Sequence, residues 1–378
     1  MRSLIKMLLL MVMLTVTHAA IAGDLEDGVA AAQKGDFATA LRFWTPLAEQ
    51  GNEDAQFILG AMYEGGDGVA QDYKAAVKWY TLAAEQGLAQ AQYNLGVMYA
   101  KGRGVAQDYK TAVKWYTLAA EQGHPKAQYN LGVMYAKGQG IAQDYKTAVR
   151  WFTLAVEQGL AQAQYNLGVM YSEGQGVAQD YKAAVKWYTL AAEQGYAQAQ
   201  YNLGVMYEQG RGVAQGYETA VKWYKLAAEQ GYAQAQFILG VMYEQGRGVA
   251  QDYKTSVKWY KLAAEQGNAL GQSNLGLMYD NGRGVAQDYK TAIKWYTLAA
   301  EQGNASAQSN LGVMYAQGQG VAQNYVKAHM WFNIAAIDGD ADSIKNRDIV
   351  TKKMSSAQLE KAQEAASRCI KQNFKNCD

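Results

Sequence analysis

Apolar residues recur at helical spacing in two parts of a segment that is repeated along the chain. Residues 91–123 read AQYNLGVMYAKGRGVAQDYKTAVKWYTLAAEQG. In the first part, Leu95 lies four positions after Ala91, and Met98 and Tyr99 lie three and four positions after Leu95. This period predicts an amphipathic helix that buries one face.

The second part predicts another helix with an apolar inner face. Gly102 and Gly104 form a short loop in which the chain can adopt backbone angles that other residues avoid. Asp108 is a favoured residue for the start of a helix, and Gly123 is typical of the position just beyond its end. The predicted inner face consists of Ala112, Val113, Trp115, Tyr116, Ala119 and Ala120.

This helix–loop–helix segment recurs with a fixed period. The tryptophans that mark it are 36 residues apart: Trp79, Trp115, Trp151, Trp187, Trp223, Trp259, Trp295 and Trp331. A fixed period of this length indicates a stacked array in which each repeat contacts its neighbours, rather than one globular core.

A glycine recurs inside the first helix, at Gly96 and its equivalents, where neither a cap nor a turn requires it. Glycine in a helix interior costs roughly 1 kcal/mol relative to alanine. Its recurrence therefore predicts close packing of the two helices of a repeat. The expected partner is the bulky side chain of Trp115 on the second helix.

The runs A-x-A-Q-Y-N-L-G-x-M-Y, G-x-G-V-x-Q-D-Y and A-V-K-W-Y-x-L-A-A-E-Q-G resemble Sel1-like repeats, which are related to the tetratricopeptide repeat. The resemblance covers eight repeats, residues 53–340. It implies an all-α fold, an α-solenoid of stacked antiparallel helix pairs wound as a right-handed superhelix. It also implies a protein that binds other proteins, and it does not imply an enzyme.

The first 22 residues have the pattern of a secretory signal. Arg2 and Lys6 precede the apolar run MLLLMVMLTVT, and Ala20 and Ala22 supply a small-residue cleavage site. The run is short for a membrane span, which disfavours the alternative of an uncleaved anchor. The sequence therefore predicts an exported protein, periplasmic or secreted, that is not inserted in a membrane after the signal is cleaved.

The segments on either side of the repeats are predicted to close the array. Residues 23–52 predict an N-terminal helix pair close to a plain tetratricopeptide repeat, and residues 341–378 predict C-terminal capping helices. Residues 355–358 have the form of a capping box. The two cysteines of the chain, Cys369 and Cys377, are predicted to form a disulfide in an exported protein.

Composition argues against several classes of function. The formal net charge is +1 with interspersed signs, so no basic surface for nucleic acid is expected. The three histidines are isolated, and no zinc-protease, serine-hydrolase or phosphate-loop motif occurs. The recurring G-x-G pairs are interpreted as turns. No metal site, cofactor or catalytic residue is predicted.

Differences between repeats indicate where a partner could bind. The second, fifth, twelfth and thirteenth positions of the first helix vary, counting Ala89 as the first. In tetratricopeptide-type arrays these positions face the concave surface, so the resemblance implies a protein or peptide ligand there. The alternative is that the aromatic residues pack between repeats. The candidate residues are Tyr93, Asn94, Lys101, Tyr129, Asn130, Lys137, Tyr165, Asn166, Glu173, Tyr201 and Asn202.

The leading hypothesis is an exported protein-binding scaffold, with a role in host–microbe interaction as one setting. The alternative is a cell-wall or β-lactam-related activity, which has been linked to cysteine-rich secreted relatives of these repeats. Those relatives carry a cysteine pair in each repeat, whereas residues 53–340 contain no cysteine. This difference favours the scaffold. The sequence does not identify the partner.

Overall fold

The computed structural model describes residues 19–337, 339–375 and 377, and among them it contains 20 α-helices and no strand. The chain divides into two compact units, residues 1–187 and 188–378, each built in the same way. The helices are α2 (Ala19–Gln33), α3 (Phe37–Glu49), α4 (Glu53–Gly65), α5 (Tyr73–Glu85), α6 (Ala89–Lys101), α7 (Tyr109–Glu121), α8 (Pro125–Lys137), α9 (Tyr145–Glu157), α10 (Ala161–Glu173), α11 (Tyr181–Glu193), α12 (Ala197–Gln209), α13 (Tyr217–Glu229), α14 (Ala233–Gln245), α15 (Tyr253–Glu265), α16 (Ala269–Asn281), α17 (Tyr289–Ala300), α18 (Ala305–Gln317), α19 (Tyr325–Ala335), α20 (Ala341–Thr351) and α21 (Ser356–Lys371).

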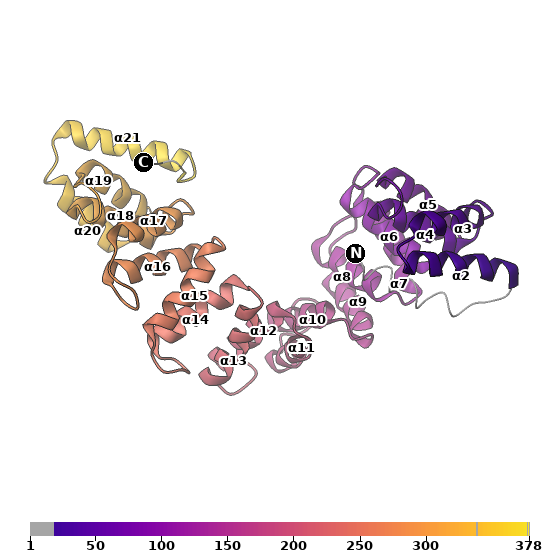
Figure 1. Cartoon of the computed structure of the whole chain (residues 1–378). Coiled ribbons are helices and arrows are strands. Elements are labelled where there is room, and N and C mark those ends of the chain that lie inside the picture. The colour runs from indigo at the N-terminus through magenta and orange to yellow at the C-terminus, as the bar shows by residue number, and fades with distance from the viewer. Residues whose placement is uncertain (1–18, 338, 376, 378) are drawn as a thin grey trace. The chain divides into compact units, whose positions relative to one another are not determined.

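Within each unit, consecutive helices pack as pairs and the pairs stack (Figure 1). We call the first helix of a repeat the A helix and the second the B helix, so that α6 and α7 are A and B of the second repeat. Inside each unit the A helices pack along their own B helices, as α6 does on α7, and the B helices pack against the next A helix, as α7 does on α8. The predicted all-α solenoid of helix pairs is confirmed.

The predicted helix ends are confirmed. The Asp108 side chain accepts hydrogen bonds from the backbone N–H groups of Lys110 and Thr111, at 2.9 and 3.3 Å, and so caps α7. Gly123, predicted just beyond the end of α7, has φ of +85°, and Gly102 ends α6 in the same left-handed conformation, with φ of +65°. These contacts satisfy backbone groups that a helix leaves unpaired at its ends.

The apolar core lies between repeats as much as within them. One buried cluster joins Tyr80 of the B helix α5 to Leu95 and Met98 of the A helix α6, which belongs to the next repeat. A single repeat could not enclose these side chains alone. Stacking of neighbours is therefore what buries the core, as expected for a repeat array.

Gly96 does allow close helix packing, but the predicted partner was wrong. A Cβ atom at Gly96 would lie 2.7 Å from the ring of Tyr116, the residue after Trp115. One position along a helix turns a side chain through about 100°. Trp115 therefore points away from Gly96 and packs on the cluster shared with the preceding repeat, where Tyr80 lies.

The second loop glycine brings adjacent repeats together. Gly104 has φ of +71°, and a Cβ there would overlap the backbone carbonyl of Tyr73 in the preceding repeat. Both the backbone angle and the lack of a side chain are needed, since the loop lies directly on the start of α5. This close approach accounts for the recurrence of the glycine pair.

A ladder of glutamine side chains also links the repeats. Buried Gln92, at the fourth position of its repeat, donates from Nε2 to the carbonyl of Ala84 at the end of the preceding B helix, at 3.2 Å. Its Oε1 accepts from Gln122 at 2.8 Å, and Gln122 also donates to the Gly87 carbonyl. In the second unit, Gln236 makes the equivalent bonds.

The two ends of the chain differ from the repeats. The predicted signal, residues 1–22, lies largely outside the described residues, and α2 begins at Ala19. At the C-terminal end, the predicted capping box is confirmed, because Ser355 and Gln358 bond each other's backbone N–H at the start of α21. Cys369 and Cys377 are joined by a disulfide.

Gly216 stands at a position where the other repeats have a capping aspartate, or asparagine at Asn324. Gly216 begins α13 without a side-chain hydrogen bond, in an extended conformation that any residue can adopt. We expect Gly216→Asp to stabilise α13 by a few tenths of a kcal/mol to about 1 kcal/mol. Native-state hydrogen exchange of the first turn of α13 should slow. Asp252→Gly in the next repeat is the matched reverse change, and it should speed hydrogen exchange in the first turn of α15. If each variant exchanged at the wild-type rate in its own helix, this account would be contradicted.

Candidate functional site

The predicted aromatic row lies half-buried on the A helices. In the first unit, the Tyr93 ring is tilted against Tyr116 of its own B helix, with ring centroids 6.0 Å apart, and Tyr129 lies 5.9 Å from Phe152 in the same way. Each tyrosine packs on the cluster between its repeat and the next. Each ring therefore has a structural role and remains partly exposed.

The predicted asparagine row is used inside the protein. The Asn130 side chain lowers the pKa of the Tyr93 and Tyr116 phenols of the preceding repeat, against the larger opposing effect of burial. Asn94 has the same effect on the pKa of Tyr80 in the repeat before it. The row therefore links one repeat to the next, a role that the variation between repeats had not indicated.

The thirteenth positions are the most accessible part of the predicted surface. Lys101, Lys137 and Glu173 are exposed at the ends of α6, α8 and α10, all in the first unit. Tyr165 and Asn166 are half-buried on α10. The remaining candidates are also half-buried but belong to the second unit: Tyr201 and Asn202 on α12.

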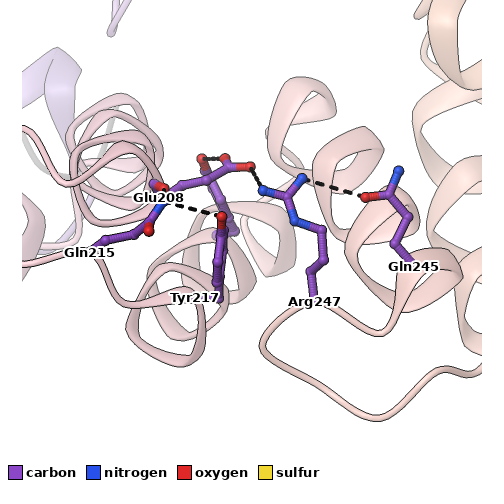
Figure 2. Close-up of polar contacts among 6 residues, drawn as sticks. Glu208, Gln215, Tyr217, Gln245 and Arg247 are labelled. Atoms are coloured by element: carbon purple, nitrogen blue, oxygen red, sulfur yellow. Dashed lines mark hydrogen bonds and ion pairs between the residues drawn. The ribbon is translucent and has the colours of Figure 1, made fainter.

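A polar network that sequence reasoning missed joins two repeats of the second unit (Figure 2). The Tyr224 hydroxyl donates to the Glu208 carboxylate at 2.7 Å, and Arg247 of the next repeat lies 3.3 Å from the same carboxylate. The Arg247 guanidinium stacks on the Tyr217 ring at 4.6 Å and donates to Gln245. One carboxylate thus connects a buried phenol to an arginine on the neighbouring loop.

The electrostatics of this network favour structure over proton transfer. Burial, followed by the neighbouring Glu208 carboxylate, raises the pKa of Tyr224 far above its usual range. The phenol therefore stays protonated and acts as a hydrogen-bond donor. A group that cannot ionise near neutral pH is unsuited to act as a general base.

Matched differences between repeats would have revealed this network. Glu64 pairs with Tyr80 and Arg103 in the first unit, and Glu244 pairs with Tyr260 in the second. Where the B helix has phenylalanine at the position of Tyr224, the A helix has alanine at the position of Glu208. These pairs are Ala136 with Phe152 and Ala316 with Phe332. No carboxylate stands opposite a phenylalanine, although Tyr116 and Tyr188 face Ala100 and Ser172 in place of a carboxylate.

His124 is an unusual helix cap. Its Nδ1 accepts from the backbone N–H of Ala127 at 3.2 Å, and its Nε2 lies 3.0 Å from Oε1 of Gln90. Its ring stacks on Tyr93 at 4.6 Å. The two hydrogen bonds of the ring nitrogens require the neutral ring with the proton on Nε2. Burial, with Lys126 nearby, lowers the pKa of His124 to about 4, which keeps this form at neutral pH.

Two further properties bear on function. Among the described residues, no three histidine, cysteine, aspartate or glutamate side chains gather where they could bind a metal ion. No helix within that part of the chain has both the length and the apolar character needed to cross a membrane.

Comparison with known proteins gives consistent matches. A family model described as Sel1 repeat matches eight consecutive segments: residues 53–88, 89–124, 125–160, 161–196, 197–232, 233–268, 269–304 and 305–340. No curated protein sequence matches the chain.

Two solved structures are similar over most of their own lengths. One is a protective antigen present in uropathogenic Escherichia coli strains, described as having an SLR fold. It is 33% identical, with 94% of this chain and 93% of that chain covered and a TM-score of 0.53. The other is a Sel1 repeat protein from Oxalobacter formigenes, 34% identical over 65% of this chain and 96% of that chain, with a TM-score of 0.58.

The tyrosine–carboxylate pair predicts a rescue by double substitution. Glu208→Ala should destabilise its repeat by about 1–3 kcal/mol, because the buried Tyr224 hydroxyl loses its acceptor. Adding Tyr224→Phe reproduces the pairing of Ala136 with Phe152 and should recover most of the lost stability. Hydrogen exchange in α12 and α13 would measure both effects. A double variant as unstable as the single one would show that the hydroxyl does not depend on Glu208.

The histidine cap predicts a local dependence on pH. An unfolded histidine titrates near pH 6.5, whereas His124 has a pKa of about 4 in the folded chain. The unfolded chain therefore binds more protons between these values. The contribution to stability is full above about pH 6.5 and is lost as the pH falls toward 4, by an amount on the order of 1–3 kcal/mol.

His124→Asn provides the control, since Asn52 and Asn304 cap the equivalent helices. At each pH, hydrogen exchange of α8 in the two proteins can be compared directly. The wild-type helix should lose protection relative to the variant as the pH falls. A constant ratio across this range would rule out titration of the cap.

Proposed function

Because the chain belongs to the Sel1 repeat family, we propose that it is an exported scaffold that binds another protein through its A helices. The proposed surface in the first unit includes the open parts of Tyr93, Tyr129 and Tyr165. The exposed ends of the same helices, at Lys101 and Lys137, form its charged edge.

The observation that carries this proposal is the contrast between fixed and variable positions. Leu95, Gly96 and Tyr116 are buried and hold the helix pair together. The thirteenth position is exposed and changes from lysine at 101 and 137 to glutamate at 173. Variation at an exposed site on a constant frame is expected where a surface is adapted to a partner. Aromatic rings add contact area at small entropic cost.

Three observations support export. The first 22 residues have the pattern of a cleaved signal. The disulfide between Cys369 and Cys377 suits an oxidising compartment. The similar Escherichia coli protein is described as a protective antigen, which agrees with a location accessible outside the cytoplasm. N-terminal sequencing of protein from the periplasm and the medium tests this, and an intact Met1 in both fractions would refute cleavage.

A binding role accounts for the described groups better than catalysis does. The tyrosines nearest to the candidate surface have raised pKa values through burial, so they donate hydrogen bonds rather than accept protons. No observation on the described residues favours the alternative of cell-wall or β-lactam-related activity. A host–microbe setting is supported by the description of the similar antigen alone.

A charge-reversal pair tests the proposed surface. Mature wild-type protein is immobilised beside the Lys101→Glu/Lys137→Glu variant, and captured envelope and extracellular proteins are quantified by mass spectrometry. A true partner should fall by about tenfold or more on the variant, because the charges at the edge of its contact are reversed.

Lys110→Glu/Lys146→Glu is the matched control, since these exposed lysines lie on the B helices of the same two repeats. It should retain the partner. Equal capture on all three proteins, or loss only on the control, would place binding elsewhere.

A further inference from the structure

An open groove lies on the B-helix side of the second unit, between α13 and α15 and over α14. Its volume is about 530 Å³. Ala228 and Gly231 contribute to one wall, and Trp259 and Leu262 to the other. None of these residues belongs to the A-helix surface proposed above, so a ligand bound here would be independent of that proposal.

The chain itself fills the corresponding groove two repeats further along. The helix α21 packs against the B helix α19, alongside which it lies in Figure 1. Its residues Ala366 and Cys369 belong to the same buried cluster as Trp331, the equivalent of Trp259. Beyond α21, the Phe374 ring lies beside Gly303, the equivalent of Gly231, 3.4 Å from where a Cβ would be.

Burial shows how completely a helix covers this type of groove. Ile334 beneath the cap is 2% exposed, whereas the equivalent Leu262 in the open groove is 36% exposed. Trp331 is 1% exposed, whereas Trp259 is only half-buried. The open groove therefore leaves uncovered the apolar side chains that a docked helix encloses two repeats later.

The inner face of α21 indicates what such a helix needs. Its buried residues are Ala362, Ala366 and Cys369, which are small and lie at helical spacing. Small side chains let the backbone of a helix approach the wide tryptophan ring. A larger residue at these positions would hold the helix away from the groove.

The two grooves differ in charge. Lys225 and Lys258 line the open groove, where the covered groove has Thr297 and Met330. Among the first seven repeats, the Lys225 position is threonine in all but the fifth and the sixth, which have Lys225 and Lys261. Lys225 lies 3.9 Å from Glu229 on the same helix, but an exposed pair of this kind is weak and leaves the lysine available.

We propose that the open groove between α13 and α15 docks an acidic amphipathic helix of another protein. The helix would have alanine-sized residues on its inner face, as α21 does on α19, and carboxylates beside Lys225 and Lys258. This charge argument disfavours the C-terminal helix of a second copy. Between Ser356 and Lys371 that helix has two glutamates against two lysines and one arginine.

The probe is a fluorescent peptide with the sequence of residues 355–374. Cys369 is replaced by alanine, and Lys361, Arg368 and Lys371 by glutamate. Because an isolated helix of this length is marginal in water, a staple on its exposed face keeps it helical. The comparison peptide keeps the natural charges. Fluorescence anisotropy with the full mature protein should show the acidic peptide binding about tenfold or more tightly than the comparison peptide.

A photoreactive group on the acidic peptide locates the contact. Crosslinks should fall on α13 and α15. Leu262→Glu should reduce their yield about tenfold or more, whereas Leu270→Glu, on an exposed leucine of α16 outside the groove, should not. Lys225→Thr, which introduces the residue found in most repeats, should reduce the preference for the acidic peptide. Circular dichroism checks that each variant is folded.

Several results would overturn the proposal. Equal affinity for both peptides would remove the argument from charge. Tighter binding of the natural-charge peptide would identify the occupant as a second copy of this chain. Crosslinks to α19 would show that the probe displaces α21, and crosslinks to A helices other than α14, which forms the floor of the groove, would place the contact on the other surface. Failure of the acidic peptide to bind would reject the groove as a helix-docking site.

Discussion

The stack depends on one buried amide that recurs at the fourth position of each repeat. The last carbonyl groups of a helix have no partner within that helix, and here they are covered by the next repeat. Gln92 satisfies the Ala84 carbonyl at such an end, while Gln122 satisfies Gln92 in turn. Buried polar groups without partners are costly, so this exchange permits close stacking without loss of hydrogen bonds. It also fixes the position of each A helix against the preceding B helix.

Much of the fold could be predicted from the sequence because it depends on local signals. The 36-residue period predicts the repeats, and the aspartate and glycine residues predict where the helices begin and end. The partner of Gly96 was not predictable from size alone, since Tyr116 and Trp115 are adjacent and only their direction on the helix separates them. Direction depends on where neighbouring helices lie, which is a tertiary property.

The candidate site was harder to predict for a related reason. Variation between repeats predicts ligand contact at the twelfth position, but at Glu208 it reflects an internal partner, Tyr224, and a cation of the next repeat, Arg247. Paired changes indicate contact within the protein, whereas changes without a partner indicate a free surface. Lys101 on an A helix is of the second kind, and Lys225 on a B helix varies between repeats while its neighbour Glu229 does not change with it. The two sides of the stack can therefore be adapted separately.

The glutamine ladder has a consequence for how such a chain changes length in evolution. Because Gln92 and Gln236 make the same bonds to their preceding repeats, each junction offers the next repeat an equivalent set of donors and acceptors. Adding or removing one whole copy of 36 residues brings two such equivalent junction surfaces together. The new junction then regains the bonds of the old one. Copy number can drift while each join remains intact, and surface residues are carried to new places along the array.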